Sequence, residues 1–146
     1  MKVVVDTNIL VSALLVKAGK PAQIIEALDE HRYSLFLSPE ILAETEDVLN
    51  RPRIRRRYPV TKKDVARFLT LLHECSTTIR PKLTVEVVKD DPDDNKFLAL
   101  AKETDADYIV SGDQHLTRLK EYEGISILTP AQFLAILKAE KISNQF

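Results

Sequence analysis

The sequence Lys2-Val3-Val4-Val5-Asp6-Thr7-Asn8 decides how the rest of the chain can fold. Its first half is apolar and β-branched, and this half lacks the alternation of polar and apolar residues that is typical of a strand with one solvent-exposed face. It therefore predicts a short strand that is buried on both sides. The polar half that follows places an acid, Asp6, directly where this strand would leave the sheet. Similar short apolar segments at 34–37, 107–110 and 125–128, with a weaker one at 77–79, predict further strands.

Helical patterns alternate with these strands. Ser38-Pro39 and Thr129-Pro130 each combine an N-cap residue with a proline at the first helical position, and Thr61 with Asp64 resembles a capping box. We expect helices over 8–15, 21–30, 39–50, 61–74, 91–104 and 116–120, and from 130 onward. Residues 51–63 are expected to form a connection, and 82–89 a weakly defined extended stretch. Strands alternating with helices predict an α/β fold with a mainly parallel central sheet covered on both faces.

Composition limits the class of protein. The 146 residues contain 21 Lys and Arg against 22 Asp and Glu, a formal net charge of -1, which argues against a chain that coats nucleic acid. Cys75 is the only cysteine and the three histidines are scattered, so a disulfide within the chain and a cysteine-based zinc cluster are excluded. No apolar run approaches the ~20 residues of a membrane helix, and Asp6 argues against a signal peptide. We expect one domain over 1–146, with a frayed tail from about 140, in a cytoplasmic protein without membrane contact.

Two acids follow predicted strands, at the edge of a parallel sheet where ligands bind. Asp6 ends the first strand, and Asp113 follows the strand 107–110 after a Ser-Gly turn. Each has a structural alternative, since Asp6 could cap the helix that starts near Asn8 and Asp113 could cap the short helix near 116. Taken singly, capping is the better explanation of either acid.

Two further acids lie on apolar helix faces. Glu44 is three residues after Ile41 and four before Val48, and Asp94 is three residues before Phe97 and four before Leu98. The structural alternatives are a buried Glu44 paired with an arginine of 51–57 and an Asp94 that complements the helix dipole. The neighbouring Asp91 fits an N-cap better than a site role, and Asp93 fits a solvated acid.

The four acids Asp6, Glu44, Asp94 and Asp113 could therefore converge at one end of the sheet. Two carboxylates about 4 Å apart repel by about 4 kcal/mol at an effective dielectric near 20, so such a cluster needs protons or cations. An all-oxygen ligand set suits Mg²⁺ or Mn²⁺, and Mg²⁺ held by a few carboxylates usually serves phosphate chemistry.

The predicted connection 51–63 is strongly basic. It contains seven cations and no acid: Arg51, Arg53, Arg55, Arg56, Arg57, Lys62 and Lys63. Four of them, Arg53, Arg55, Arg56 and Arg57, are candidate contacts for an RNA backbone. The alternative is a solvated junction between helices, and the sequence does not separate the two.

Four segments in order resemble the motifs of PIN domains. Residues 3–8 (VVVDTN) resemble the opening motif, 38–44 (SPEILAE) the segment with the second acid, 91–101 (DPDDNKFLALA) the third, and 106–113 (ADYIVSGD) the fourth. Residues 127–134 (ILTPAQFL) resemble the usual ending. The nearest subgroup is that of small prokaryotic, VapC-like ribonucleases, the toxins of toxin–antitoxin systems.

The resemblance implies a three-layer α/β/α Rossmann-like fold and a metal-dependent ribonuclease, a hydrolase that cleaves single-stranded or exposed RNA. It implies Asp6, Glu44, Asp94 and Asp113 as catalytic, metal-binding carboxylates for one or two Mg²⁺ or Mn²⁺ ions. Asn8 would orient Asp6 through a hydrogen bond, and Ser111 would support the fourth acid or hold a water, although both also suit local turn chemistry. His115 departs from the pattern, since many PIN domains carry an acid there; it could bind phosphate, weaken one of two metal sites, or be a surface residue.

Partners follow from the same resemblance. RNA is the expected substrate, a small antitoxin the expected inhibitor, and a homodimer the expected assembly. Three other functions stay open on sequence alone. The chain could process RNA in housekeeping, it could be an Mg²⁺-dependent phosphoryl-transfer or receiver-type protein in which Lys96 contacts the phosphoryl group, or it could be a catalytically silent interaction module.

Overall fold

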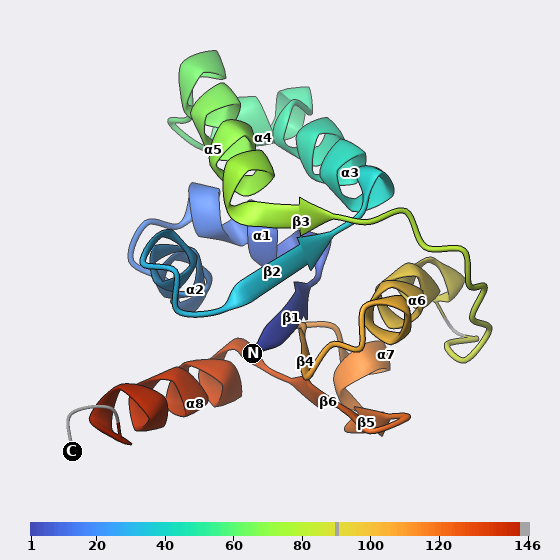
Figure 1. Ribbon diagram of the computed structural model, residues 1–146. Coiled ribbons are helices and arrows are strands. Elements are labelled where there is room, and N and C mark those ends of the chain that lie inside the picture. The colour runs from blue at the N-terminus through green and yellow to red at the C-terminus, as the bar shows by residue number, and fades with distance from the viewer. Residues whose placement is uncertain (90, 144–146) are drawn as a thin grey trace.

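The computed structural model describes residues 1–89 and 91–143, in which six strands form one sheet. Figure 1 shows this sheet with helices around it. The strands lie in the order β3-β2-β1-β4-β6-β5. Every pair is parallel except the β5–β6 pair. Their bounds are β1 Lys2–Val5, β2 Ser34–Leu37, β3 Ser76–Thr78, β4 Tyr108–Val110, β5 Glu121–Tyr122 and β6 Ile125–Leu128. The predicted α/β class and its mainly parallel sheet are confirmed.

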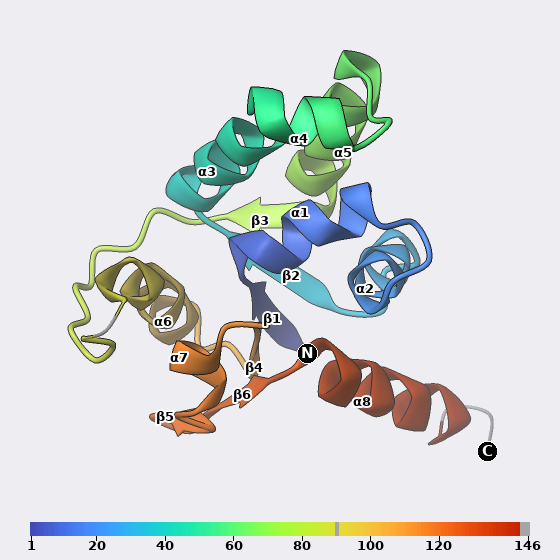
Figure 2. The ribbon, with the colours of Figure 1, turned by 180° about the vertical axis from the view of Figure 1, so that it is seen from behind.

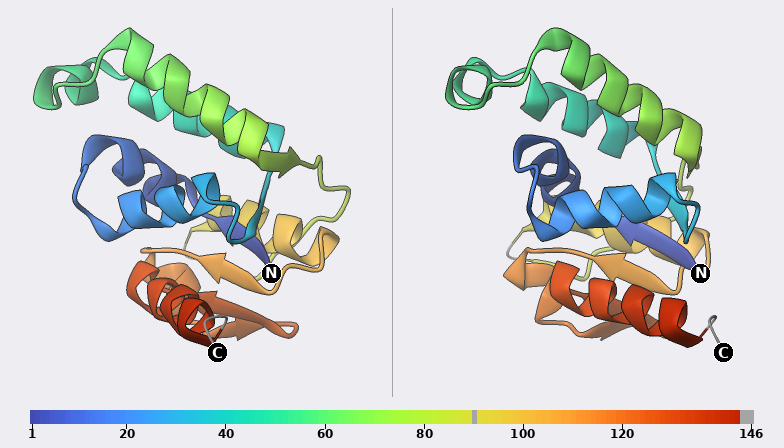
Figure 3. Two further views of the ribbon diagram at one scale, coloured as in Figure 1. Left: turned by 60° about the vertical axis from the view of Figure 1, so that its left-hand side comes forward. Right: turned by 90° about the vertical axis from the view of Figure 1, so that its left-hand side faces the viewer.

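Helices cover both faces of this sheet. Figure 3, on the right, shows α2 and α8 on the near side of the strands and α6 behind them, while α3, α4 and α5 lie beyond the β3 edge. Figure 2 shows the same arrangement from behind, with α6 and α7 together at one side. The bounds are α1 Thr7–Leu15, α2 Lys20–Asp29, α3 Pro39–Leu49, α4 Pro52–Arg57, α5 Lys62–Cys75, a 3-10 turn η1 Pro92–Asp94, α6 Asn95–Glu103, α7 Gln114–Thr117 and α8 Pro130–Ser143.

The core forms because the central strands have no polar face. Val3, Val4 and Val5 are all fully buried in β1, and Leu98 and Leu100 of α6 are buried against the sheet. Phe133 of α8 is fully buried and packs edge-on against Tyr33, with 5.1 Å between the ring centroids. Each buried side chain of this size contributes about 1.5–3 kcal/mol of transfer free energy, so the sheet centre is held firmly.

The capping motifs act as the sequence predicts. The Ser38 side chain accepts a hydrogen bond from the Ile41 N–H at the start of α3, and Thr61 with Asp64 forms a reciprocal capping box on α5. Thr129 and Gln132 exchange the same two bonds before α8.

Two local predictions are wrong: the basic connection contains the helix α4, and the short helix near 116 begins at Gln114 and ends at Thr117. The two-residue strand β5 was not predicted. The helix α8 extends to Ser143 and 144–146 lie outside the described residues, so the frayed tail stays a prediction. No described helix combines the length and the apolar character that crossing a membrane requires.

Candidate metal centre

The candidate site lies where β1 and β4 end side by side. After β1 the chain continues to β2 on one side, and after β4 it continues to β5 and β6 on the other side. In parallel sheets such a point leaves a crevice at the carboxyl ends of the two strands. Asp6 follows β1 directly, and its N–H donates to the Val110 carbonyl of β4 over 3.0 Å. Asp113 follows β4 after a two-residue turn. The fold thereby brings two acids that are over a hundred residues apart in sequence to one edge of the sheet.

Asp6 is held rigidly by its neighbours. Its side chain is buried, Oδ1 accepts a hydrogen bond from the Ile9 N–H at 2.9 Å, and Oδ2 accepts one from the Ser111 hydroxyl. The same hydroxyl oxygen accepts from the Asp113 N–H at 2.9 Å, so fully buried Ser111 joins the two acidic turns. Burial raises the pKa of Asp6, and the hydrogen bonds from Ser111 and Ile9 act in the opposite direction.

Both strand-end acids also cap helices, as the structural alternatives predicted. Asp6 caps α1, and Asp113 Oδ1 accepts from the His115 N–H at 2.8 Å at the start of α7. Capping and ligand binding are compatible here, because a carboxylate has about four lone-pair directions and each cap uses one.

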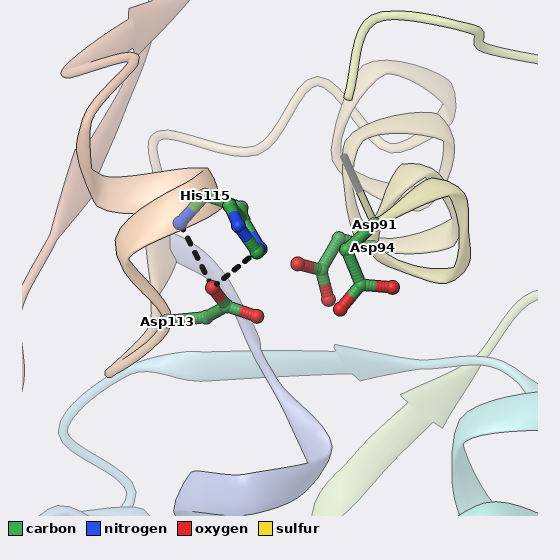
Figure 4. A group of neighbouring side chains, drawn as sticks. All are labelled: Asp91, Asp94, Asp113 and His115. Carbon is green, nitrogen blue, oxygen red and sulfur yellow. Dashed lines mark hydrogen bonds and ion pairs between the residues drawn. The ribbon is translucent and has the colours of Figure 1, made fainter. Parts of the chain in front are cut away.

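The opposite wall comes from η1 and the start of α6. Asp94 is 7% exposed and its Oδ2 has no hydrogen-bond partner, although buried carboxylate oxygens are nearly always paired. Asp91 does not cap the helix with its side chain, contrary to the prediction. Figure 4 shows Asp91 and Asp94 facing Asp113 and His115 across a gap. Each of these four residues offers a ligand atom within 4.8 Å of the others, the one such group among the described residues.

The side chains of this ligand group (Asp91, Asp94, Asp113 and His115) lie close together, and the pKa values of Asp94 and Asp113 are shifted. Burial, the hydrogen bond with Asp113, and the charges of Asp113, Asp91 and Asp6 together raise the pKa of Asp94 to about 8. Burial alone would raise the pKa of Asp113, but hydrogen bonds from Asp94 and the His115 N–H outweigh it and lower that pKa. Near neutral pH, Asp94 therefore keeps a proton, which a cation would displace.

Glu44 lies near this group but outside it. Its carboxylate forms an ion pair with Lys96, not with an arginine as the structural alternative proposed, and Lys96 also bonds Asp93 at 2.7 Å. The Lys96 side chain is 9% exposed. Burial works to lower the pKa of Lys96, but the bonds to Asp93 and Glu44 outweigh it and raise that pKa, so the ammonium stays charged.

One cleft of about 350 Å³ contains the acidic side chains described above. It is lined by Asp6, Thr7, Asn8, Glu44, Val48, Arg51, Asp91, Asp93, Asp94, Phe97 and Asp113. The four acids predicted as ligands thus share a cleft, and their role as ligands stays a prediction. Asn8 is exposed on the cleft wall, while the hydrogen bonds to Asp6 come from Ile9 and Ser111.

The chemistry of the cleft fits a divalent cation. Besides Asp94 Oδ2, the buried atoms without a hydrogen-bond partner include Thr7 Oγ1 and His115 Nδ1, and Nδ1 lies 3.4 Å from Asp113 Oδ1. A bound cation would provide a partner for buried oxygen and nitrogen atoms that lack one and that lie beside several carboxylates.

Part of the basic run lies on α4, and one residue of the run, Arg51, reaches the cleft. Arg51 precedes α4 and lines the cleft, and Arg53, Arg56 and Arg57 are exposed. Arg55 is tied to the protein, because its guanidinium donates to the Val60 carbonyl and to Asn50 Oδ1. The candidate RNA contacts thus divide into three exposed cations and one partly buried structural one.

Sequence reasoning missed three residues of the site. Asp91 was assigned to capping, although its place in the acidic run Asp90-Asp91-Pro92-Asp93-Asp94 was a signal of a site role. Lys96 was weighed only as a phosphoryl contact, and its proximity to Glu44 depends on how α3 and α6 meet. Thr7 gave no signal, because a threonine after a strand is common.

Comparison with known proteins agrees with this architecture. The sequence profile of the PIN domain matches residues 2–115. A Methanocaldococcus jannaschii protein, the uncharacterized MJ1680, is 34% identical over 121 residues, which cover 83% of this chain and 76% of that protein. A chain of the crystal structure of VapBC2 from Rickettsia felis, bound to a DNA fragment from their promoter, superposes with a TM-score of 0.54. The match covers 88% of this chain and 98% of that one at 15% identity, a likeness of fold.

Proposed function

The chain belongs to the PIN domain family, and we propose that it is a metal-dependent endoribonuclease that hydrolyses phosphodiester bonds in single-stranded or exposed RNA. One observation carries the proposal. Asp91, Asp94, Asp113 and His115 converge within 4.8 Å, and one of their buried carboxylate oxygens has no partner in the protein. Such a group is costly for the fold and useful for binding a cation.

The proposed ion is Mg²⁺ or Mn²⁺. Carboxylates from Asp91, Asp94 and Asp113 would hold it, with Asp6 beside them and fixed by Ser111. Oxygen ligands suit both ions, whereas the imidazole of His115 favours Mn²⁺ over Mg²⁺. When bound, the ion supplies Lewis-acid activation of a phosphodiester and of the attacking water.

The protein's own residues would position the RNA. Arg53, Arg56 and Arg57 are exposed on α4, and Arg51, which pairs with Asp47, lines the cleft, so these arginines would guide an RNA backbone toward the acidic cluster. Lys and Arg neutralise backbone phosphates without reading sequence. Asp91, Asp94 and Asp113 would hold the cation next to the scissile phosphodiester, and Ser111 keeps the Asp6 and Asp113 turns aligned.

Lys96 favours the nuclease over the phosphoryl-transfer alternative. A receiver-type site needs a lysine free to meet the phosphoryl group. Here the Lys96 ammonium is engaged by Glu44 and Asp93. A silent module is also disfavoured, because a cluster without function would gain stability by losing its charges.

The biological role is proposed as the toxin of a toxin–antitoxin pair, acting as a homodimer and held by a small antitoxin. The support is likeness of fold to a chain of VapBC2. Housekeeping RNA processing is the alternative. Co-expression with the product of the adjacent reading frame distinguishes them: a stable complex that suppresses cleavage supports the toxin role, and cleavage unaffected by that product supports housekeeping.

Cleavage of labelled single-stranded RNA by the purified protein tests the proposed activity. We expect cleavage with Mn²⁺ or Mg²⁺, none after EDTA treatment, and recovery when Mn²⁺ is restored, because the acids alone cannot activate a phosphodiester. A double-stranded RNA of the same sequence is the control and should be cut more slowly. Cleavage that persists in excess EDTA, or no cleavage of any RNA with either metal, would contradict the proposal.

Metal affinity should depend on pH through Asp94. The pKa of Asp94 is raised to about 8, so below that pH a cation must displace its proton. We expect the dissociation constant for Mn²⁺, measured by calorimetry, to fall by about tenfold per pH unit from pH 6 toward 8 and then level off. Running the titration in buffers of different ionisation enthalpy counts the released proton. An affinity that is flat between pH 6 and 8 would contradict a metal ligand at Asp94 whose proton the cation displaces in this pH range.

A further inference from the structure

Lys96 occupies an unfavourable position that helix stability does not explain. It lies in the first turn of α6, where the helix dipole disfavours a cation, and its side chain is 9% exposed. Its ammonium pairs with Glu44 of α3 and with Asp93 of η1 at 2.7 Å, and it lies 5.2 Å from the ring centroid of Phe97 on the cleft wall. These contacts are the reason that the charge can be buried there.

Glu44 consequently takes no part in the ligand group. It lines the same cleft from the α3 side, but it has no place among the four residues whose ligand atoms lie within 4.8 Å, in the part of the chain that the structure describes. Its carboxylate is already neutralised by a cation that the protein supplies.

Charge in the cleft divides accordingly. Six carboxylates line it, from Asp6, Glu44, Asp91, Asp93, Asp94 and Asp113. Lys96 pairs with Glu44 and Asp93. Of the other four, Asp91, Asp94 and Asp113 belong to the ligand group, and Asp6 is bonded to Ile9 and Ser111 beside it. A second divalent ion at Glu44 would have to displace a buried ammonium or lie beside it, and like charges at that distance repel strongly.

We infer that the Lys96 ammonium takes the place of a second divalent cation at Glu44, so that the cleft binds one metal ion and Lys96 is a positioning residue for Glu44. The inference rests on the proposed function, since it assumes an ion at the ligand group. The competing explanation is a purely structural clamp between α3 and α6. A clamp would lose stability when Lys96 is replaced, but the number of bound ions would not change.

Counting Mn²⁺ ions tests the inference. The protein is titrated with Mn²⁺ at pH 8, and free Mn²⁺ is followed by electron paramagnetic resonance. We expect one ion for the wild type and two for Lys96→Met, which keeps an apolar stem and frees Glu44. The double variant Lys96→Met/Glu44→Gln should return to one ion, since it removes the new ligand.

Two control variants distinguish the loss of the positive charge at Lys96 from the loss of a lysine elsewhere on α6. Lys96→Arg keeps a cation at Glu44 and should bind one ion. Lys102→Met removes a lysine from the far end of α6, where Lys102 pairs with Glu123 at 2.6 Å, and should also bind one. Melting temperatures confirm that each variant is folded, and Lys96→Gln substitutes for Lys96→Met if the latter does not fold.

The outcomes separate this inference from the proposed function. Two ions in the wild type, or one ion in a folded Lys96→Met protein, would overturn the inference and leave the metal-dependent nuclease standing. No ion in any variant would overturn both.

Discussion

Replacing Asp94 with Asn is expected to abolish RNA cleavage and, at the same time, to stabilise the metal-free protein. Cleavage with Mn²⁺ should fall by about 100-fold or more, since even an outer partner of a metal site costs about 10- to 100-fold when it is removed. The melting temperature without metal should rise at pH 8, because Asn resembles the protonated acid and carries no charge to repel Asp91 and Asp113. Loss of activity together with a gain of stability distinguishes a ligand from a merely structural residue.

The sign of the stability change follows from linkage. The folded-state pKa of Asp94 is raised to about 8, so Asp94 binds its proton more tightly in the folded chain than in the unfolded chain. Its favourable contribution is present below pH 4 and is lost as the pH rises toward 8. We expect a gain of about 2 kcal/mol for Asp94→Asn at pH 8 and none near pH 4, less than the full linkage because Asp113 shares the proton.

The neighbouring acid Asp93 supplies the matched control. Asp93 lines the same cleft, but its side chain is 66% exposed and it lies outside the ligand group. Asp93→Asn should leave cleavage within a few-fold of the wild type and should not raise the melting temperature at pH 8. If Asp94→Asn retained most of the cleavage activity, Asp94 could not be a metal ligand.

Replacing Ser111 with Ala is expected to have the second largest effect. Its hydroxyl donates to Asp6 Oδ2 and accepts from the Asp113 N–H at 2.9 Å, so the change leaves buried Asp6 with an unpaired oxygen. We expect a loss of about 1–3 kcal/mol in the free energy of unfolding, measured with urea. Cleavage should fall by about 10- to 100-fold, because both strand-end acids lose their register.

Ser76 offers a control of the same chemistry. Its hydroxyl oxygen is also buried but has no hydrogen-bond partner, so Ser76→Ala should cost little stability or increase it slightly. Similar losses for Ser76→Ala and Ser111→Ala would mean that any serine deletion in the sheet is harmful. Ser111 would then have no special part in aligning Asp6 and Asp113.

The sequence could predict the fold because its local signals agree with one another. A β-branched run specified β1 and a short apolar run specified β2, and Ser38-Pro39 and Thr61 with Asp64 specified helix starts that the structure confirms. The helix α4 was missed because five of its six residues are proline or arginine, without an apolar stripe to give it a period. β5 was missed because two residues carry no pattern.

The site was less predictable than the fold. Strand ends brought Asp6 and Asp113 together by topology alone, and spacing placed Asp94 and Glu44 toward the interior. The ion pair between Glu44 and Lys96, and the turn of Asp91 toward Asp113 and His115, depend on how α3, η1 and α6 meet. No local pattern encodes such contacts between elements that are distant in the sequence.

A crystal structure with Mn²⁺, with anomalous data collected at the manganese edge, would show directly whether the cleft binds a metal ion. We expect one anomalous peak, within coordination distance of the Asp94 and Asp113 carboxylates and beside Asp91 and His115, with none at Glu44 while Lys96 is present. If no peak appeared in the cleft at millimolar Mn²⁺, or if the peak lay away from these acids, the cleft would not be a metal centre.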